Sequence, residues 1–341
     1  MRLAQRSAVI FAATISGLAL TGTAAAMPVS SARGMAGAAM NCLKVKATIQ
    51  LGNSPEGLAV DPATNTVYAT IPDGNSVSVI NGATHTVTAT IGVGSSPQGI
   101  AVDPATNTVY AANAGSDSVS VISGQTNTVT ATIDVASSVT AVAVDPVTDR
   151  IYASGHPTTY VINGQTDTVV DTFFGSPAGS FFLSVNSRTN TIYLANRDKY
   201  VVVVNGRTNT RTARVDVLGE PVATAVNQRT NTIYAGNGSS GNLSVINGKT
   251  NKVTAQITPV YGLGLIAVAV NQRSNDVYVT GGADSVYAVN GRTNTISASI
   301  KLDANGIAVN PSTGTIYTAD SAPPGEPEPN TVSALTSTCC S

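Results

Sequence analysis

A short β-type run with a single tyrosine in its middle recurs through this chain at an almost constant interval. The first copy is Thr66-Val-Tyr-Ala-Thr70, and successive tyrosines lie 39 to 44 residues apart. A period of this length indicates a repeat architecture, in which each unit buries its apolar face against the next unit. The seven tyrosines are Tyr68, Tyr110, Tyr152, Tyr193, Tyr234, Tyr278 and Tyr317.

Each unit has the pattern of four short strands. In the first unit these are residues 57–61, 66–71, 76–80 and 86–91, joined by a Pro-Ala-Thr-Asn turn, a polar loop and an Asn-Gly pair. Asparagine tolerates a left-handed backbone, and Asn-Gly predicts a tight hairpin. Four antiparallel strands per unit predict an all-β protein, a seven-bladed β-propeller. We expect both faces of each blade to be buried, the tyrosines to lie in the core, and three acids to cap turn N–H groups: Asp61, Asp103 and Asp145.

The seventh unit is incomplete. Its strands are predicted at residues 308–310, 315–318 and 331–335, and no fourth strand follows. At the other end of the chain, Lys44–Ile49 matches Thr86–Ile91, the fourth strand of the first unit. The N-terminal segment is therefore predicted to supply the outer strand of the last blade, which closes the ring and removes its open edge.

The same alignment brings the cysteines of the two chain ends to one hairpin. We expect Cys42 to form a disulfide with Cys339 or Cys340, as an oxidising compartment permits. Two alternatives remain open, a bridge between Cys339 and Cys340 and a bridge between molecules.

The N-terminus has the pattern of an export signal. Residues 1–26 combine Arg2 and Arg6, an apolar stretch from Ala8 to Leu20, and a small-residue cleavage site at Ala24-Ala-Ala26. The alternative is a membrane anchor. Residues 27–41 are predicted to be a flexible linker and residues 42–341 the propeller, with no transmembrane segment after cleavage. The expected product is a secreted monomer, and its association with the cell surface is left open.

The strand order of a propeller divides its connections between two faces. The first-to-second and third-to-fourth connections repeat almost unchanged, so we call their side the uniform face. The other connections differ between units and form the variable face, which is where a scaffold carries a binding site. Counting back from each first strand predicts a ring at the mouth of the central channel: Glu56, Gln98, Thr140, Phe181, Val222, Ile266 and Asn305.

This ring is polar on one side and apolar on the other, which suits a peptide or a small amphipathic ligand. The alternative is a channel mouth that only holds water. No catalytic residue is predicted, because His85 and His156 fall on different faces. Glu56 and Asn305 are candidates for an oxygen-ligand Ca²⁺ or Mg²⁺ site that Asp73 or Asp320 would complete.

Two further features of the sequence bear on partners. Residues 322–329 form a Pro/Glu insertion on the variable face, predicted to be a stiff flap or docking strand. The cationic residues are dispersed through the sequence, so nucleic-acid binding is not predicted. Partners are expected to be a protein, a peptide or a small molecule.

Three tyrosine strands carry a family resemblance. They read IYLAN at 192–196, IYAGN at 233–237 and VYVTG at 277–281, preceded by AVDP or AVNP-type boxes and followed by SVIN-G. This pattern resembles the YVTN-family β-propeller repeats, whose members are typically exported or surface-layer proteins. Related streptogramin lyases and propeller lactonases share the ring, but the lyase pattern needs clustered His and Glu, which this chain lacks.

The resulting hypothesis is a secreted binding or scaffold protein that uses its variable face. The alternative from the enzyme class is a metal-assisted lyase or lactonase with its site at the channel mouth.

Overall fold

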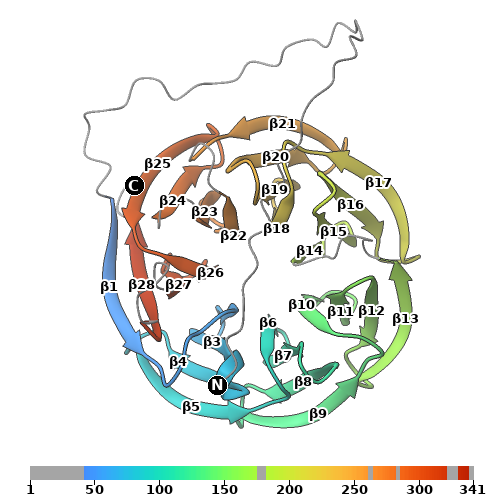
Figure 1. Ribbon diagram of the computed structural model, residues 1–341, viewed down its shortest axis with the longest axis vertical. Coiled ribbons are helices and arrows are strands. Elements are labelled where there is room, and N and C mark those ends of the chain that lie inside the picture. The colour runs from blue at the N-terminus through green and yellow to red at the C-terminus, as the bar shows by residue number, and fades with distance from the viewer. Residues whose placement is uncertain (1–41, 175–181, 260–263, 282–284, 321–328, 338–341) are drawn as a thin grey trace, which may run out of the picture. The chain divides into compact units, whose positions relative to one another are not determined.

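The protein is a ring of seven four-stranded antiparallel sheets (Figure 1). This computed structural model describes residues 42–174, 182–259, 264–281, 285–320 and 329–337. Within those residues, no helix reaches the length and apolarity that crossing a bilayer requires. The predicted seven-bladed β-propeller is confirmed.

In blades 1 to 6 the strands run in chain order from the centre of the ring to its rim (Figure 1). Blade 1 comprises β2 (Leu58–Asp61), β3 (Thr66–Ile71), β4 (Ser76–Asn81) and β5 (Thr86–Gly92), with a 3-10 turn at Pro72–Gly74. Blade 2 comprises β6 (Pro97–Asp103), β7 (Thr108–Asn113), β8 (Ser118–Ser123) and β9 (Thr128–Asp134). Blade 3 comprises β10 (Val139–Asp145), β11 (Arg150–Gly155), β12 (Thr158–Asn163) and β13 (Thr168–Phe174).

The remaining blades repeat this order. Blade 4 comprises β14 (Leu183–Asn186), β15 (Thr191–Asn196), β16 (Tyr200–Asn205) and β17 (Thr210–Asp216). Blade 5 comprises β18 (Pro221–Asn227), β19 (Thr232–Asn237), β20 (Leu243–Asn247) and β21 (Lys252–Ile257). Blade 6 comprises β22 (Leu265–Val270), β23 (Asp276–Gly281), β24 (Ser285–Asn290) and β25 (Thr295–Lys301). Blade 7 comprises β26 (Ala304–Val309), β27 (Ile316–Asp320), β28 (Thr331–Ser337) and, as its outer strand, β1 (Leu43–Gln50).

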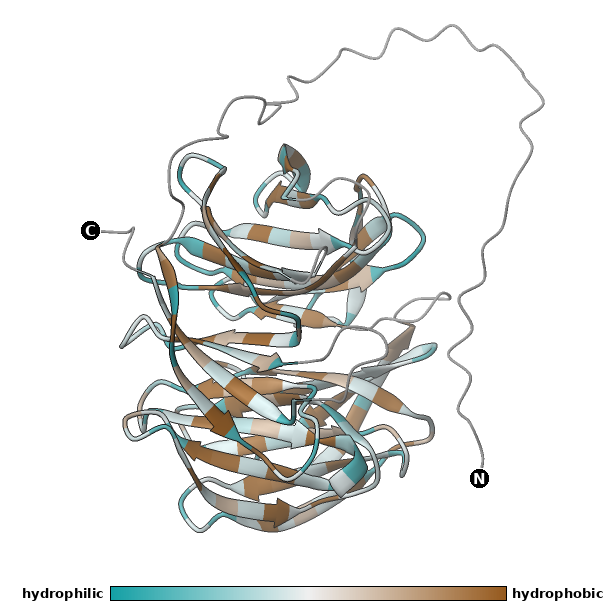
Figure 2. Cartoon of the chain, turned by 60° about the vertical axis from the view of Figure 1, so that its left-hand side comes forward, coloured by the Kyte–Doolittle hydropathy of each residue, from teal (hydrophilic) through white to brown (hydrophobic). Residues whose placement is uncertain are grey.

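The core lies between neighbouring blades. The seven repeat tyrosines are each 2% exposed or less, which confirms their structural role. The expectation that both faces of every strand are buried is wrong for the outer strands. In β5 only Ile91 is buried, because the blades diverge toward the rim and leave the fourth strand open to solvent. Hydrophilic residues gather in the turns at the strand ends (Figure 2).

The first-to-second turns have the predicted chemistry. Asp61 Oδ1 accepts a hydrogen bond from Ala63 N at 2.8 Å, and Asp103 and Asp145 make the equivalent bonds at 2.9 and 3.0 Å. Asn65 has the expected left-handed backbone, with φ of 55°. Each turn is therefore closed by its own aspartate or asparagine.

The third-to-fourth hairpins differ from the prediction. The tight Asn-Gly turn is replaced by a wider loop, in which His85 N donates to Asn81 O at 2.8 Å and His85, not Gly82, is left-handed (φ 58°). Gly82 is needed for a different reason. A Cβ there would lie 2.5 Å from Asn65 Oδ1, because the hairpin packs against the neighbouring turn.

The ring closes as predicted. β1 pairs antiparallel with β28, with Ile49 opposite Val332 and Leu43 opposite Ser337. The seam between blades 7 and 1 repeats the contacts of the internal seams. Asn310 Nδ2 donates to Asn65 Oδ1 at 2.7 Å, as Asn186 Nδ2 does to Asn231 Oδ1 at 2.8 Å between blades 4 and 5.

The disulfide prediction concerns the same region. Cys339 and Cys340 lie outside the described residues, so their pairing with Cys42 stays a prediction. The Leu43–Ser337 register places the described residues nearest to these cysteines in sequence opposite each other.

His85 gives the seam a pH dependence. Its ring lies 6.4 Å from that of Tyr317, at a position where four other blades have asparagine. Burial, and then the charge of Lys46, lowers the pKa of His85. The unfolded chain therefore takes up the proton more readily as the pH falls below about 6.5, and folding stability is lost on the acid side. We expect the melting temperature of the His85→Asn variant to rise relative to wild type between pH 7 and pH 5. A difference that stays constant across this range would contradict the assignment.

Candidate functional site

The first strands of the blades surround a small central cavity of about 170 Å³. Its lining side chains are apolar apart from Glu56 and Thr224, and Thr224 Oγ1 already donates to Tyr193 O at 3.2 Å. Glycines let neighbouring first strands approach closely; a Cβ on Gly306 would lie 2.3 Å from Glu56 O. The channel is therefore narrow, and Glu56 is its one charged lining residue among the described positions.

The described residues of the predicted ring each directly precede a residue that lines the central cavity. Glu56, Gln98, Thr140, Val222, Ile266 and Asn305 are all half-buried, and Phe181 lies outside the described residues. Glu56 lines the central cavity, whereas Val222 and Ile266 line a second cavity on the variable face. Gln98, Thr140 and Asn305 line neither of these two cavities.

This second cavity, which we call the variable-face pocket, has a volume of about 380 Å³. It lies over blades 4 to 6 and is bounded by the connections β15–β16, β17–β18, β19–β20 and β21–β22. Its wall is largely apolar, with one cation and one anion. The lining residues are Phe182, Arg197, Glu220, Val222, Gly238, Ser239, Gly264, Leu265 and Ile266.

The loops of blade 5 are fixed to each other beside this pocket. Gly238 N donates to Glu220 O at 2.7 Å, and Glu220 N donates to Ser239 Oγ at 3.1 Å. The next residue, Ser240, donates a hydrogen bond from its Oγ to Leu218 O at 2.7 Å. Because backbone groups of both loops are joined, the Glu220 side of the pocket is preformed.

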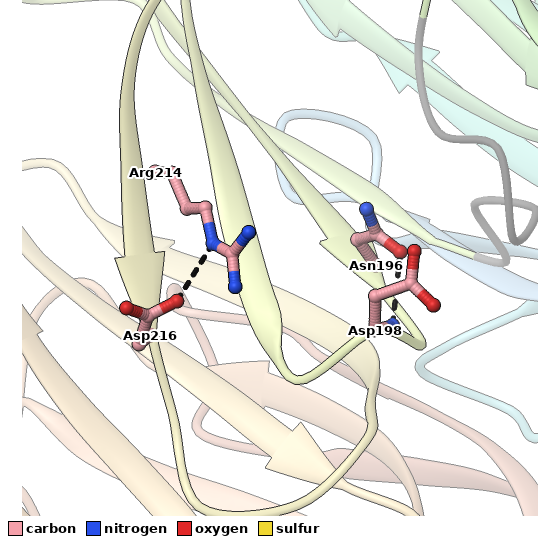
Figure 3. Close-up of polar contacts among 4 residues, drawn as sticks. All are labelled: Asn196, Asp198, Arg214 and Asp216. Atoms are coloured by element: carbon pink, nitrogen blue, oxygen red, sulfur yellow. Dashed lines mark hydrogen bonds and ion pairs between the residues drawn. The ribbon is translucent and has the colours of Figure 1, made fainter.

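Contacts at both ends fix the loop that carries Arg197. Figure 3 shows the Asn196–Asp198 contact at its start and the Arg214–Asp216 pair. At its start, Asp198 N donates to Asn196 Oδ1 at 3.0 Å, and Asn196 is fully buried. At its end, Tyr200 is covered by Arg214, whose guanidinium carbon lies 3.9 Å from the ring centroid. Arg214 Nε in turn pairs with Asp216 Oδ1 at 2.7 Å. These contacts position the backbone of Arg197 at the pocket rim.

Asp320, one of the candidate metal ligands, lies in a polar cluster of blade 7. Asp320 is buried and accepts hydrogen bonds from Thr318, Thr331 and Ser333 hydroxyls at 2.7, 2.8 and 2.7 Å. Burial raises the pKa of this carboxyl, and the three hydroxyls partly offset the effect. Its carboxyl oxygens are therefore engaged within blade 7, and its contribution to a metal site stays a prediction. No three His, Cys, Asp or Glu side chains within the described ranges are grouped to hold a metal ion.

Sequence reasoning missed much of the pocket. Arg197 and Ser239 lie in loops that were assigned to the variable face, but nothing in the sequence showed that these loops meet. Glu220 lies in the connection that leads into blade 5. The equivalent connections into blades 2 and 3 contain no acidic residue, and this difference was the available signal. The Pro/Glu segment 322–329 falls almost wholly outside the described residues.

Comparison with known proteins supports the fold alone. No protein-family model matches the chain, and no curated protein matches it. Solved structures do match, and one of them is the structure of U3-55K. It is 13% identical, with a TM-score of 0.74, over 86% of this chain and 98% of that chain. At such low identity the likeness shows a shared β-propeller architecture, which many unrelated functions use.

Proposed function

We propose that this chain is an exported binding or scaffold propeller that holds its partner on the variable face. The variable-face pocket is the observation that carries this proposal. Its volume of about 380 Å³ lies within the range of pockets that bind small ligands or peptide side chains. The partner class is a peptide, a small molecule or a cell-surface component that presents such a group.

The lining favours an amphipathic ligand. Val222 and Ile266 offer an apolar wall that would contact an aliphatic or aromatic group. Arg197 and Glu220, at the rim, would orient the polar part of the same ligand through charge. Since a backbone N–H in each rim loop donates a hydrogen bond that holds the loop, binding requires little ordering of the protein.

Export and family membership are part of this proposal and rest on the sequence. Residues 1–26 have the composition of a cleavable signal. The IYLAN-type strands support membership of the YVTN-repeat group. A partner outside the cytoplasm, in the medium or on a cell surface, follows from both.

The pocket is tested by removing its apolar wall. We expect peptides selected from a phage-displayed library against the wild-type protein to lose about tenfold or more in affinity for the Val222→Asn/Ile266→Asn variant, because a few buried apolar contacts carry most binding energy. The measurement is surface plasmon resonance with each selected peptide.

The matched control is Leu218→Asn. Leu218 is apolar and 58% exposed on the same face, but it does not line the pocket. Selected peptides should bind this variant as they bind wild type. Peptides that bind all three proteins equally would place the interaction elsewhere.

A further inference from the structure

The two halves of the ring carry opposite charge. Residues 51–174, which span blades 1 to 3, contain ten acids and one cation, Arg150. Residues 183–301, which span blades 4 to 6, contain twelve cations and five acids. The net charge of the chain is close to zero, but blades 4 to 6 are strongly basic, although their cationic residues are dispersed in the sequence.

Six of these cations lie at equivalent positions on the uniform face. One follows the first strand of each of blades 4 to 6, in the turn that leads to the second strand. The other occupies the third-to-fourth hairpin of the same blade. We call the six exposed residues the basic arc: Arg188, Arg207, Arg229, Lys249, Arg273 and Arg292.

The arc is confined to three consecutive blades. At the seven described equivalent positions of blades 1, 2, 3 and 7, no residue is charged: Ala63, Ala83, Ala105, Gln125, Val147, Gln165 and Ser312. Blade 3, next to the arc, instead presents Asp149 and Asp167 on this face. The arc therefore has a defined end.

The repeated turn chemistry gives all six residues the same backbone setting. In each case the backbone N–H of the cation donates to the Oδ1 of the asparagine two residues before it, at 2.8 to 3.1 Å. Side chains therefore leave the surface in a regular array, two per blade. Across one seam, Arg229 Nη1 donates to Arg273 O at 3.1 Å, so neighbouring blades contribute to one continuous surface.

These charges are not neutralised within the described protein. The ion pair found among the described residues is that of Arg214 and Asp216, on the outer strand β17. None of the large apolar side chains found exposed lies in the arc. The surface is thus positive, regular and without an apolar group to insert into a partner.

We propose that the basic arc binds a linear anionic polysaccharide with an acidic group on each repeat. A regular array of cations fits a polymer whose charges are also regular. Five of the six residues are arginine, whose planar guanidinium pairs with carboxylate, sulfate or phosphate through two hydrogen bonds. A flexible chain can follow the arc, whereas a flat anionic membrane would also approach Asp149 and Asp167. Single-stranded nucleic acid is disfavoured because the arc offers no aromatic side chain for base stacking.

The test compares a variant in which three arc residues are neutralised with a control variant in which three cations outside the arc are neutralised. The arc variant is Arg207→Gln/Lys249→Gln/Arg292→Gln, with one change in each of blades 4 to 6. The control variant is Arg211→Gln/Lys252→Gln/Lys301→Gln, which removes the same charge from exposed outer-strand positions of the same blades. Binding to heparin and to polygalacturonate is measured by isothermal titration at 50 and 200 mM NaCl, with duplex DNA and phosphatidylglycerol vesicles as comparison ligands.

We expect wild type to bind both polysaccharides more tightly than DNA or vesicles, with affinity falling as salt rises. The arc variant should lose about tenfold or more at 50 mM NaCl and show a shallower salt dependence, because about half of the contacts are gone. The control variant should lose less than threefold, and the Val222→Asn/Ile266→Asn variant should bind as wild type does.

Equal losses in the arc and control variants would overturn the proposal, because net charge alone would then explain binding. Absence of polysaccharide binding, or tighter binding of DNA or vesicles, would overturn it as well. Circular dichroism of each variant verifies that the propeller is intact.

Discussion

Replacing Tyr317 by alanine lowers the free energy of unfolding by about 3–5 kcal/mol, the cost of deleting a large aromatic side chain from a core. Tyr317 is fully buried at the seam between blades 7 and 1, packed in one cluster with Ile49, Val67 and Val332. The cluster joins the first blade, the last blade and the N-terminal strand, so the cavity weakens the contact that closes the ring. The measurement is equilibrium unfolding in urea.

The control is Tyr317→Phe. It keeps the ring and removes only the hydroxyl, which donates to Gly82 O at 3.3 Å, so the expected loss is about 0.5–1.5 kcal/mol. Similar losses for alanine and phenylalanine would show that the hydroxyl, and not the packed ring, stabilises the seam.

The second large effect is expected from a charge placed in the closing strand. Ile49 is 3% exposed in β1 and lies opposite Val332 of β28. The Ile49→Asp variant buries a carboxylate without a partner, which costs about 4 kcal/mol or more. We expect β1 to detach, so that limited proteolysis cleaves within residues 43–50 before the rest of the propeller is digested.

The same strand provides the control. Val45 is 44% exposed in β1, and Val45→Asp is expected to change stability by no more than about 0.5 kcal/mol. If Val45→Asp releases β1 as readily as Ile49→Asp, the strand is not held by its buried side chains.

The architecture was readable from the sequence because it is encoded in each repeat. The tyrosine interval fixed the number of blades, and the Lys44–Ile49 match located the strand that completes the seventh. Local turn chemistry was readable for the same reason at Asp61 and Asn65. The prediction for the Asn-Gly hairpins was wrong because Gly82 is required by close packing against Asn65, 17 positions earlier in the chain. Local turn rules do not consider such a contact.

The candidate site was only partly readable. Val222 and Ile266 were placed at the mouth by counting along the strands, and they do line the variable-face pocket. Arg197 and Glu220 join them through loops whose length and course differ between blades, so no periodic rule predicts the encounter. The basic arc was missed for the opposite reason. Its residues are far apart in sequence, and only the repeat places Arg207, Lys249 and Arg292 at one position of successive blades.

The central claim is that the partner is held at the variable-face pocket. It is tested most directly by incorporating the photo-crosslinker p-benzoylphenylalanine at Val222, and at Val147 on the opposite face, where the side chain is 73% exposed. Each protein is irradiated with the cell-envelope and medium fractions of its native culture. The account predicts a discrete cross-linked product from position 222 that is absent from position 147. A product from position 147 and none from position 222 would contradict it.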